Sequence, residues 1–175
     1  MPNILTSTFK TPVGELLLGS FDDQLVLADW TYRKMRPSID QRIQNYFGAS
    51  YQDGENDVLR DTKRQLTEYF TGERKAFTLP LLFTGTTFQH MVWNSLLNIP
   101  YGNTTTYLEL SKTLGAEKAI RAVASANGAN ALSIIVPCHR VIGSDGKLVG
   151  YAGGLAAKKK LLALEVGLNQ TELFA

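Results

Sequence analysis

The beginning of the chain alternates between apolar runs and turn residues. Three strand-like runs rich in Leu, Val and Thr lie within residues 3–32, and turns at residues 11–14 and 22–24 separate them. Runs of this kind, divided by Pro, Gly and Asp, are typical of a β-meander, because those residues break a strand and favour turns. The pattern therefore predicts a small antiparallel sheet at the start of the chain.

Two helices are predicted next. Ser38, with Gln41 three residues later, matches a capping box, and the helix that it starts is expected to end near Gly48. A second helix is predicted from about Asn56 to Gly72, because apolar side chains recur there at intervals close to the turn of a helix. The residues of this stripe are Val58, Leu59, Leu66, Tyr69 and Phe70.

The stretch from residue 76 to residue 83 is predicted to be a further strand, and Thr84-Gly85-Thr86 follows it. At this turn the mixed pattern gives way to short, capped helices. We place a domain boundary here, between an N-terminal α/β domain of residues 1–84, which holds the small antiparallel sheet, and a mainly helical C-terminal domain of residues 85–175. The expected class of the whole chain is α+β.

The second half begins with two helices that carry their own start signals. Thr86 with Gln89 caps the first, which stops at Pro100. Thr106 with Glu109 caps the second, which ends at the next glycine.

A third helix is predicted at residues 117–126, with Ala119, Ile120 and Val123 facing inward. A short glycine-containing turn separates it from the helix before, so the pair suggests a helix-turn-helix, although plain helical hairpins look the same. On its outer side Arg121 stands among small side chains, which let a helix approach another surface closely. These are Ala122, Ala124, Ser125 and Ala126. The alternative is an ordinary packed helix, with Arg121 solvated or paired to a carboxylate.

The only cysteine, Cys138, follows the apolar run at residues 131–136 and precedes His139. We predict that this run is a buried strand and that the thiol lies where the strand breaks. A thiol beside an imidazole is placed for nucleophilic attack, because thiolate is the reactive form and a neighbouring base raises its population. Glu165, on a last predicted helix at residues 155–166, is the candidate partner that would fix the His139 tautomer. The alternative is a buried structural cysteine.

Composition limits the chemistry further. The chain has 175 residues, 44% of them hydrophobic, which is enough for a packed core, and a single cysteine cannot form an internal disulfide. Since only two histidines accompany that cysteine, the usual ligands of a zinc site are missing, and we expect no structural metal and no cofactor. Neither an export signal nor an apolar run of the roughly 20 residues that a membrane helix needs is found, so a cytoplasmic location is expected.

The formal net charge of +2 does not by itself indicate a nucleic-acid binder. Residues 86–175 carry 8 Lys and Arg against 5 Asp and Glu, whereas residues 1–85 carry 10 against 11. A polyanionic partner would therefore favour the second half of the chain. Lys158-Lys159-Lys160, on the last predicted helix, is expected to be a solvated face, with phosphate contact as the alternative.

From Phe88 to Gly167 the chain resembles the O6-alkylguanine-DNA alkyltransferases, also called methylated-DNA–protein-cysteine methyltransferases. The resemblance covers nearly half of the chain, and its motifs follow the family's order and spacing. They are Phe88-Gln89-His90-Met91-Val92-Trp93, Ile99-Pro100-Tyr101-Gly102, Arg121-Ala122-Val123, Ile135-Val136-Pro137-Cys138-His139-Arg140-Val141-Ile142-Gly143 and Gly150-Tyr151-Ala152-Gly153-Gly154.

The resemblance implies DNA repair by direct reversal of damage. The protein would bind double-stranded DNA through the minor groove as a monomer, flip out a guanine alkylated at O6, and move the alkyl group irreversibly to Cys138; O4-alkylthymine is a second candidate substrate. It implies a winged helix-turn-helix-like C-terminal domain. Arg121 would replace the flipped nucleotide in the stack, and the small residues beside it would let the helix approach both DNA backbones.

The same resemblance assigns roles to the site residues. His139 would take the thiol proton through a water, and Glu165 would orient the imidazole. Tyr107 would donate to guanine N3 as the leaving group gains charge, and Asn130 would tie the helix-turn-helix to the segment that carries Cys138. The base pocket would be shaped by Val136, Val141, Tyr151, Ala152 and Gly153.

Two positions depart from the family's pattern. Asn130 is followed by Ala131 where many members have proline, which would loosen that turn, and Ala152 replaces a serine of some relatives. Two other functions also stay open. A lesion-binding protein would flag damage without repairing it, although such proteins lack the acceptor cysteine. A thiol hydrolase would use Cys138 with His139 and Glu165 as a triad, and repeated turnover would distinguish it.

Overall fold

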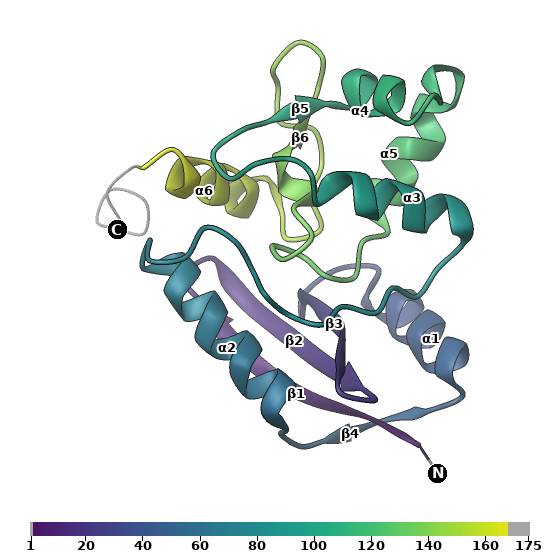
Figure 1. Ribbon diagram of the computed structural model, residues 1–175, viewed down its shortest axis with the longest axis vertical. Coiled ribbons are helices and arrows are strands. Elements are labelled where there is room, and N and C mark those ends of the chain that lie inside the picture. The colour runs from purple at the N-terminus through teal and green to yellow at the C-terminus, as the bar shows by residue number, and fades with distance from the viewer. Residues whose placement is uncertain (1, 168–175) are drawn as a thin grey trace. The chain divides into compact units, whose positions relative to one another are not determined.

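A computed structural model describes residues 2–167 of the chain. The chain divides into two compact units, and the division falls between Gly85 and Thr86 (Figure 1). Within the described residues, no helix is both long enough and apolar enough to cross a lipid bilayer.

The first unit is built on a four-stranded sheet in the order β3-β2-β1-β4. β1 (Asn3–Thr11), β2 (Gly14–Phe21) and β3 (Gln24–Trp30) are successive antiparallel strands, which confirms the predicted meander. β4 (Ser50–Asp53) pairs in parallel with β1 and makes the sheet mixed. The sequence does not reveal β4, because its residues show no apolar alternation and none of them is buried.

The strand predicted just before the domain boundary is not formed. Of that segment, only Leu81 makes a bridge, to Leu25 of β3. Pro80 has no N–H with which to extend a ladder. The N–H of Thr78 instead donates to the side-chain oxygen of Gln65, at 2.9 Å. The segment therefore runs as an irregular connection in spite of its apolar residues.

The first helix of this unit, α1 (Arg36–Phe47), begins two residues before Ser38, and the predicted capping box is wrong. Met35 is the N-cap, and the Ser38 hydroxyl donates to the Met35 carbonyl at 3.1 Å. Pro37 accounts for the earlier start, because proline fits the first turn of a helix, where its missing N–H costs no bond. The helix ends as predicted at Gly48, whose φ of 57° is left-handed.

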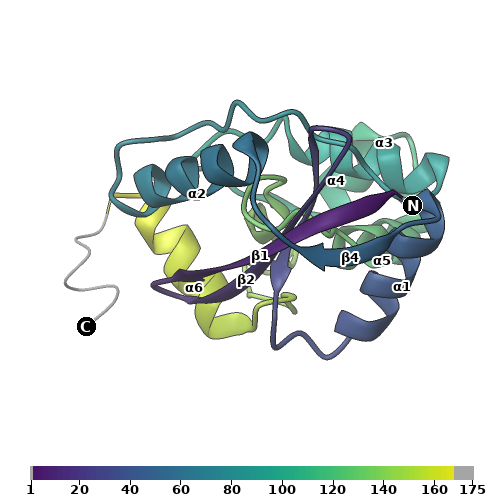
Figure 2. The ribbon, with the colours of Figure 1, turned by 90° about the horizontal axis from the view of Figure 1, so that it is seen from below.

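The second helix, α2 (Asp57–Phe70), starts at Asn56, whose side-chain oxygen accepts the N–H of Leu59 at 2.9 Å. The helix lies along β1 and β2 (Figure 2). The predicted stripe faces the core at Leu59, Leu66, Tyr69 and Phe70, and is only partly buried at Val58. The core of the first unit thus forms between this stripe and the sheet.

The second unit is mainly helical. Its helices are α3 (Thr87–Leu96), α4 (Tyr107–Thr113), α5 (Ile120–Gly128) and α6 (Leu155–Glu165), and its 3-10 turns are η1 (Glu117–Ala119) and η2 (Cys138–Arg140). β5 (Thr105–Thr106) and β6 (Val141–Ile142) form a short parallel pair. Strands of two residues are too short to leave a pattern in the sequence.

Both predicted helix starts in this unit are confirmed. The Thr86 hydroxyl accepts the N–H of Gln89 at 3.1 Å, and the Gln89 side chain accepts the N–H of Thr86 at 3.0 Å, which completes a capping box. The Thr106 hydroxyl accepts the N–H of Glu109 at 3.1 Å. α4 therefore starts at Tyr107, the residue that the site uses.

α4, η1 and α5 form a helix-turn-helix (Figure 1). The third predicted helix is split, because residues 117–119 form the 3-10 turn and α5 continues to Gly128. Val123 is fully buried, as predicted, whereas Ile120 is 36% exposed, so the prediction that it faces inward is wrong. Ile120 is the first residue of α5 and directly follows the 3-10 turn.

Candidate functional site

The apolar run before the cysteine consists of buried turns, so the predicted strand is wrong. All residues from 131 to 136 are buried, and Ile134 has a φ of 72°, which a β-branched residue adopts only when its surroundings impose it. Asn130 supplies part of that constraint. Its amide donates to the Val136 carbonyl at 2.9 Å, and its oxygen accepts the N–H of Leu132 at 2.9 Å. The side chain thus closes the turn that leads to Cys138.

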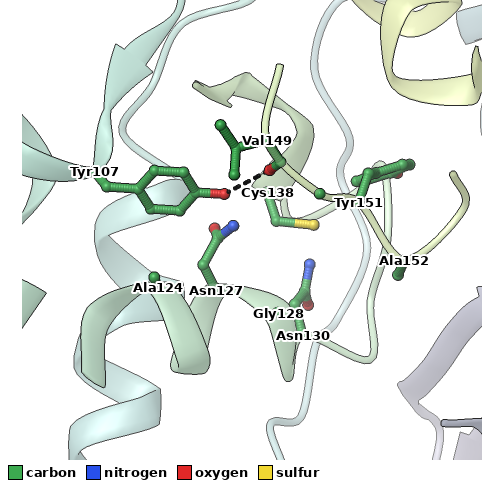
Figure 3. A pocket seen from close by; sticks show the side chains of 10 residues that line it. Tyr107, Ala124, Asn127, Gly128, Asn130, Cys138, Val149, Tyr151 and Ala152 are labelled. Atoms are coloured by element: carbon green, nitrogen blue, oxygen red, sulfur yellow. Dashed lines mark hydrogen bonds between the residues drawn. The ribbon is translucent and has the colours of Figure 1, made fainter. Parts of the chain in front are cut away.

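Cys138 is the first residue of η2, is 4% exposed, and borders a cavity of about 190 Å³. Figure 3 shows its sulfur among the lining residues, with Tyr107 on one side and Tyr151 on the other. This space is smaller than the pockets that hold drug-sized ligands and suits one small planar group. Its lining consists of Tyr107, Ala124, Asn127, Gly128, Asn130, Cys138, Val149, Gly150, Tyr151 and Ala152.

Tyr107 enters the cavity from the first turn of α4, and its hydroxyl donates to the carbonyl of Val149 at 3.3 Å (Figure 3). Burial raises the pKa of the Tyr107 phenol, and charge on Cys138 raises it further, while a hydrogen bond with Asn127 opposes the change. The phenol therefore keeps its proton at neutral pH and is available as a donor in the cavity.

His139, the residue after Cys138, forms a buried pair with Glu165. Nε2 of His139 lies 2.7 Å from Oε2 of Glu165, and both side chains are at most 1% exposed. Glu165 is the last residue of α6, so helix geometry brings it to the 3-10 turn that carries His139. The predicted partnership of these two residues is present in the structure.

The electrostatics of this pair favour a neutral imidazole and a charged carboxylate. Burial lowers the pKa of His139 below its ordinary value of 6.5, against the opposing effect of Glu165. Burial acts to raise the pKa of Glu165, but the hydrogen bonds and charges of His139 and Arg140 outweigh it and lower that pKa to about 2. A charged Glu165 carboxylate accepts a hydrogen bond from Nε2–H. In the neutral imidazole the free lone pair is therefore on Nδ1. Nδ1 is buried and has no hydrogen-bond partner among the protein atoms of residues 2–167.

Arg140 is a site residue outside the predicted set. Its Nε and Nη2 donate to the two oxygens of Glu165, at 2.7 and 3.1 Å, and its Nη1 donates to the carbonyl of Ile99 at 2.7 Å. The side chain is 8% exposed. An arginine placed directly after a Cys-His pair was a usable signal, because a buried carboxylate needs a cation.

Lys158 is a second site residue outside the predicted set. It is fully buried, so the prediction of a solvated face is wrong for this residue, while Lys159 is exposed as predicted. Its Nζ donates to the carbonyl of Val141 in β6 at 2.6 Å and to that of Gly150 at 3.2 Å. Lys158 precedes Glu165 by two helical turns, and this spacing places both on one face of α6. That spacing was the signal in the sequence.

The predicted pocket residues fall into two groups. Tyr151 and Ala152 line the cavity, whereas Val136, Val141 and Gly153 are buried but are not among its lining residues. Among the described residues, no three His, Cys, Asp or Glu side chains are grouped so that they could hold a metal ion.

The outer side of α5 is exposed at Arg121, Ala122 and Ser125. Ala124 is half-buried and lines the cavity instead. Ala126 is 3% exposed, and its carbonyl accepts the indole N–H of Trp93 at 2.8 Å, so its prediction as part of the outward face is wrong. The helical turn carries Ala126 back to the core side, where Val123 also lies.

Two family models together match most of the chain. The model described as 6-O-methylguanine DNA methyltransferase, DNA binding domain, matches residues 87–167. The model described as 6-O-methylguanine DNA methyltransferase, ribonuclease-like domain, matches residues 4–83.

Individual relatives match over nearly their whole length. The methylated-DNA–protein-cysteine methyltransferase of Methanosarcina acetivorans is 44% identical over 158 residues, which cover 90% of this chain and 95% of that protein. The constitutive methylated-DNA–protein-cysteine methyltransferase of Bacillus subtilis is 41% identical over 161 residues, which cover 89% of this chain and 91% of that protein.

Among solved structures, Mycobacterium tuberculosis OGT in complex with DNA is similar to this chain, with a TM-score of 0.81 and 37% identity over 98% of this chain and 99% of that chain. The O6-methylguanine-DNA methyltransferase of Pyrococcus kodakaraensis has a TM-score of 0.72 and 26% identity over 94% of this chain and 99% of that chain.

Proposed function

This chain belongs to the 6-O-methylguanine DNA methyltransferase family, and we propose that it repairs O6-alkylguanine in duplex DNA by moving the alkyl group to Cys138. The observation that carries the proposal is the position of Cys138, which borders a cavity sized for a planar base and directly precedes His139, the partner of the buried Glu165 carboxylate.

The transfer begins with the proton of the thiol. His139 takes it on Nδ1 through a bridging water, and the resulting imidazolium is stabilised by the Glu165 carboxylate at 2.7 Å from Nε2. The thiolate then attacks the alkyl carbon on O6. A carbon–sulfur bond forms as the carbon–oxygen bond breaks, and the electron pair of the broken bond goes to the guanine.

The guanine leaves as an anion that must be neutralised. Tyr107 is the candidate donor, because its phenol lines the cavity and keeps its proton at neutral pH. A donor that is already in place stabilises the negative charge as it develops on the base, with no need to reorganise solvent. Asn130 holds the turn before Cys138 and thereby fixes the direction of attack.

The product is a thioether, whose carbon is not activated toward water, and the chain contains no second cysteine to take over the group. Each molecule is therefore used once, which makes the protein a stoichiometric reagent. A thioester formed by a hydrolase would instead be cleaved and the thiol regenerated.

The helix-turn-helix supplies the approach to DNA. A duplex hides the O6 atom within the base stack, so the damaged nucleotide must be flipped out, at a cost of a few kcal/mol. We propose that α5 lies in the minor groove, that Ala122 and Ser125 permit close contact with the backbone, and that Arg121 fills the space of the flipped nucleotide.

We also propose that the protein works as a monomer in the cytoplasm, because a free acceptor thiol persists in a reducing compartment. O4-alkylthymine carries its alkyl group on an exocyclic oxygen as well and is a second candidate substrate.

The deciding experiment mixes the protein with a duplex that contains one O6-methylguanine and then maps the modified peptide by mass spectrometry. We expect one methyl group on Cys138 per molecule and no further repair by spent protein. Repeated turnover would indicate a hydrolase. Tight binding of the lesion with no loss of its methyl group would indicate a lesion-binding protein. A Cys138→Ser variant should retain binding and lose transfer.

A further inference from the structure

The carboxylate of Glu165 is held from more than one side. Besides the imidazole, Arg140 donates to both of its oxygens, and the N–H of Gly102 points to Oε1 at 3.4 Å. The guanidinium is itself fixed, since Nη1 donates to the carbonyl of Ile99 and Cζ lies 5.8 Å from the ring centre of Tyr101. The Ile99–Gly102 segment, which the proposed transfer leaves without a role, therefore surrounds the pair.

We propose that Arg140 is a positioning residue for the transfer, and that the Ile99–Gly102 segment is the seat that holds its guanidinium against Glu165. This inference rests on the proposed function and extends it. Arg140 does not contact the reacting atoms and acts through Glu165 on His139.

The geometry requires an arginine rather than any cation. A planar guanidinium presents parallel N–H groups to a carboxylate, and two donors fix the plane of the acceptor, which one ammonium group cannot do. A third N–H of the same group reaches Ile99 at 2.7 Å, so a rotation of Arg140 would break contacts with two segments together. The plane of Glu165 determines the direction in which His139 Nε2 donates.

The seat leaves little room for movement. Gly102 has a φ of +83°, and a Cβ atom built there would lie 3.1 Å from the backbone oxygen of Glu165. A side chain at this position would be both strained and crowded. Gly102 thus allows the segment to approach the end of α6 closely enough to complete the enclosure of the carboxylate.

The charge of Arg140 has a direct consequence for the base. The titratable or charged groups around His139 are Glu165 and Lys158 from α6 and Cys138 and Arg140 from η2, and the ring of Tyr151 lies 6.4 Å away. Around Glu165 they are His139, Arg140 and the Tyr101 phenol.

Within this set, Arg140 lowers the pKa of both His139 and Glu165. Both effects keep the imidazole neutral and the carboxylate charged. That is the state in which Nδ1 can receive the thiol proton.

The test compares the rate of methyl transfer from O6-methylguanine duplex to wild type, Arg140→Gln and Arg140→Lys under single-turnover conditions, from about pH 5.5 to pH 9. We expect the Gln variant to be slower by about 10- to 100-fold at neutral pH. In the pH profile of the Gln variant, the acid limb, where the rate falls as the pH is lowered, should move to higher pH. The reason is that the imidazole protonates more readily without the guanidinium. The Lys variant keeps the positive charge but not the parallel N–H donors of the guanidinium. Its transfer rate should lie between those of the Gln variant and wild type.

A matched control is Arg33→Gln, which removes another buried arginine, one that pairs with Asp29 at 3.1 Å in the first unit. It should lose stability without a change in the pH profile of transfer. If Arg140→Gln is slow but keeps the wild-type acid limb, or if Arg33→Gln shifts that limb equally, Arg140 is merely structural and the inference is wrong.

A second measurement covers the case in which Arg140→Gln folds poorly. The chain contains only two histidines, so ¹⁵N-histidine spectra are simple, and a His90→Asn variant assigns them. We expect His139 to be the neutral Nε2–H tautomer in wild type and to populate both neutral tautomers in Arg140→Lys, which keeps the charge but not the two donors that fix the plane of Glu165. An unchanged single tautomer in Arg140→Lys would overturn the proposal.

A double-mutant cycle, measured on the rate of transfer, tests this proposal separately from the proposed function. At a pH where His139 is neutral in every variant, so that the direct effect of the Arg140 charge on the imidazole does not enter, adding Arg140→Gln to Glu165→Gln should cause no further loss of rate if Arg140 acts through Glu165. Losses that multiply would refute this link while leaving the transfer function intact. Failure of wild type to accept a methyl group would refute the function first.

Discussion

The side chain of Asn130 donates to the backbone carbonyl of Val136 at 2.9 Å and closes the turn that presents the acceptor thiol. The same side chain accepts the N–H of Leu132, so one residue satisfies two buried backbone groups. The acceptor is therefore placed by a polar side chain inside an otherwise apolar segment, and this arrangement can be tested directly.

Asn130→Ala should leave the buried N–H of Leu132 without its acceptor and the buried carbonyl of Val136 with only one of its two donors, the N–H of Cys138. Since each unmade bond of this kind costs about 1–3 kcal/mol, we expect the free energy of unfolding to fall by about 2 kcal/mol or more, with slower transfer to Cys138. Urea unfolding followed by tryptophan fluorescence measures the first effect. Asn103→Ala, at an exposed position, is the control and should change stability little. Equal stabilities of the two variants would contradict the role given to Asn130.

Lys158→Met should loosen the connection between β6 and the cavity loop. The ammonium group donates to the carbonyls of Val141 and Gly150, and its loss leaves both without that donor. We expect a loss of about 1–2 kcal/mol of stability and a slower transfer, because Gly150 lines the cavity. Lys159→Met, one residue along and exposed, is the matched control and should stay within about 0.5 kcal/mol of wild type. A stable Lys158→Met protein with full activity would show that the bonds do not matter.

Stability should decrease as the pH falls, for two reasons with the same sign. The pKa of Glu165 is about 2 in the folded chain against 4.5 for the ordinary group, so its contribution is complete above 4.5 and is lost as the pH falls toward 2. The pKa of His139 is lowered below 6.5 by burial, so the unfolded chain binds the proton more readily, and stability declines below pH 6.5.

Urea midpoints measured at neutral pH and at about pH 3.5 check this expectation, and the comparison is with Glu165→Gln. That variant should be less stable at neutral pH and should lose less stability on acidification than wild type. Glu73→Gln removes an exposed carboxylate and should retain the wild-type dependence. The explanation fails if Glu165→Gln and wild type show the same pH dependence.

Arg121→Ala should impair repair of duplex DNA more than repair of single strands. In a duplex the residue that enters the stack offsets part of the cost of flipping, which is a few kcal/mol, so we expect a loss of about tenfold or more there. An unpaired base needs no such help. Rates on both substrates, with Arg60→Ala of the first unit as control for lost positive charge, measure the ratio. An equal loss on both substrates would point to a general electrostatic contact.

The chain's local signals predicted its local structure well where neighbours along the sequence decide the outcome. Thr86 with Gln89 forms its capping box, and Asn56 starts α2 close to the predicted position. These features form because a side chain and a backbone group only three residues apart can satisfy each other without the rest of the fold. Where a proline alters the local balance, as Pro37 does beside Ser38, the helix begins two residues before the predicted position.

The acceptor and its immediate partner were also accessible from the sequence. A lone cysteine next to a histidine after a buried run, together with Glu165 on the last helix, identified the pair that lies at 2.7 Å in the structure. The apolar run itself does not form the strand that its pattern predicts. Burial alone does not distinguish a strand from a set of turns, and the φ of Ile134 comes from contacts that only the folded chain provides.

The sequence by itself determined the elements, the chemistry of the thiol and the family of the chain, because these depend on residue types and on spacings of a few positions. Only the tertiary structure decided that Arg140 and Lys158 are buried at the site, that Ala126 faces the core, and that a cavity forms between the loop at Val149 and α5. The physical reason is that a charged side chain is buried only when distant segments supply its partners, and those partners are brought within reach by the packing of the whole unit.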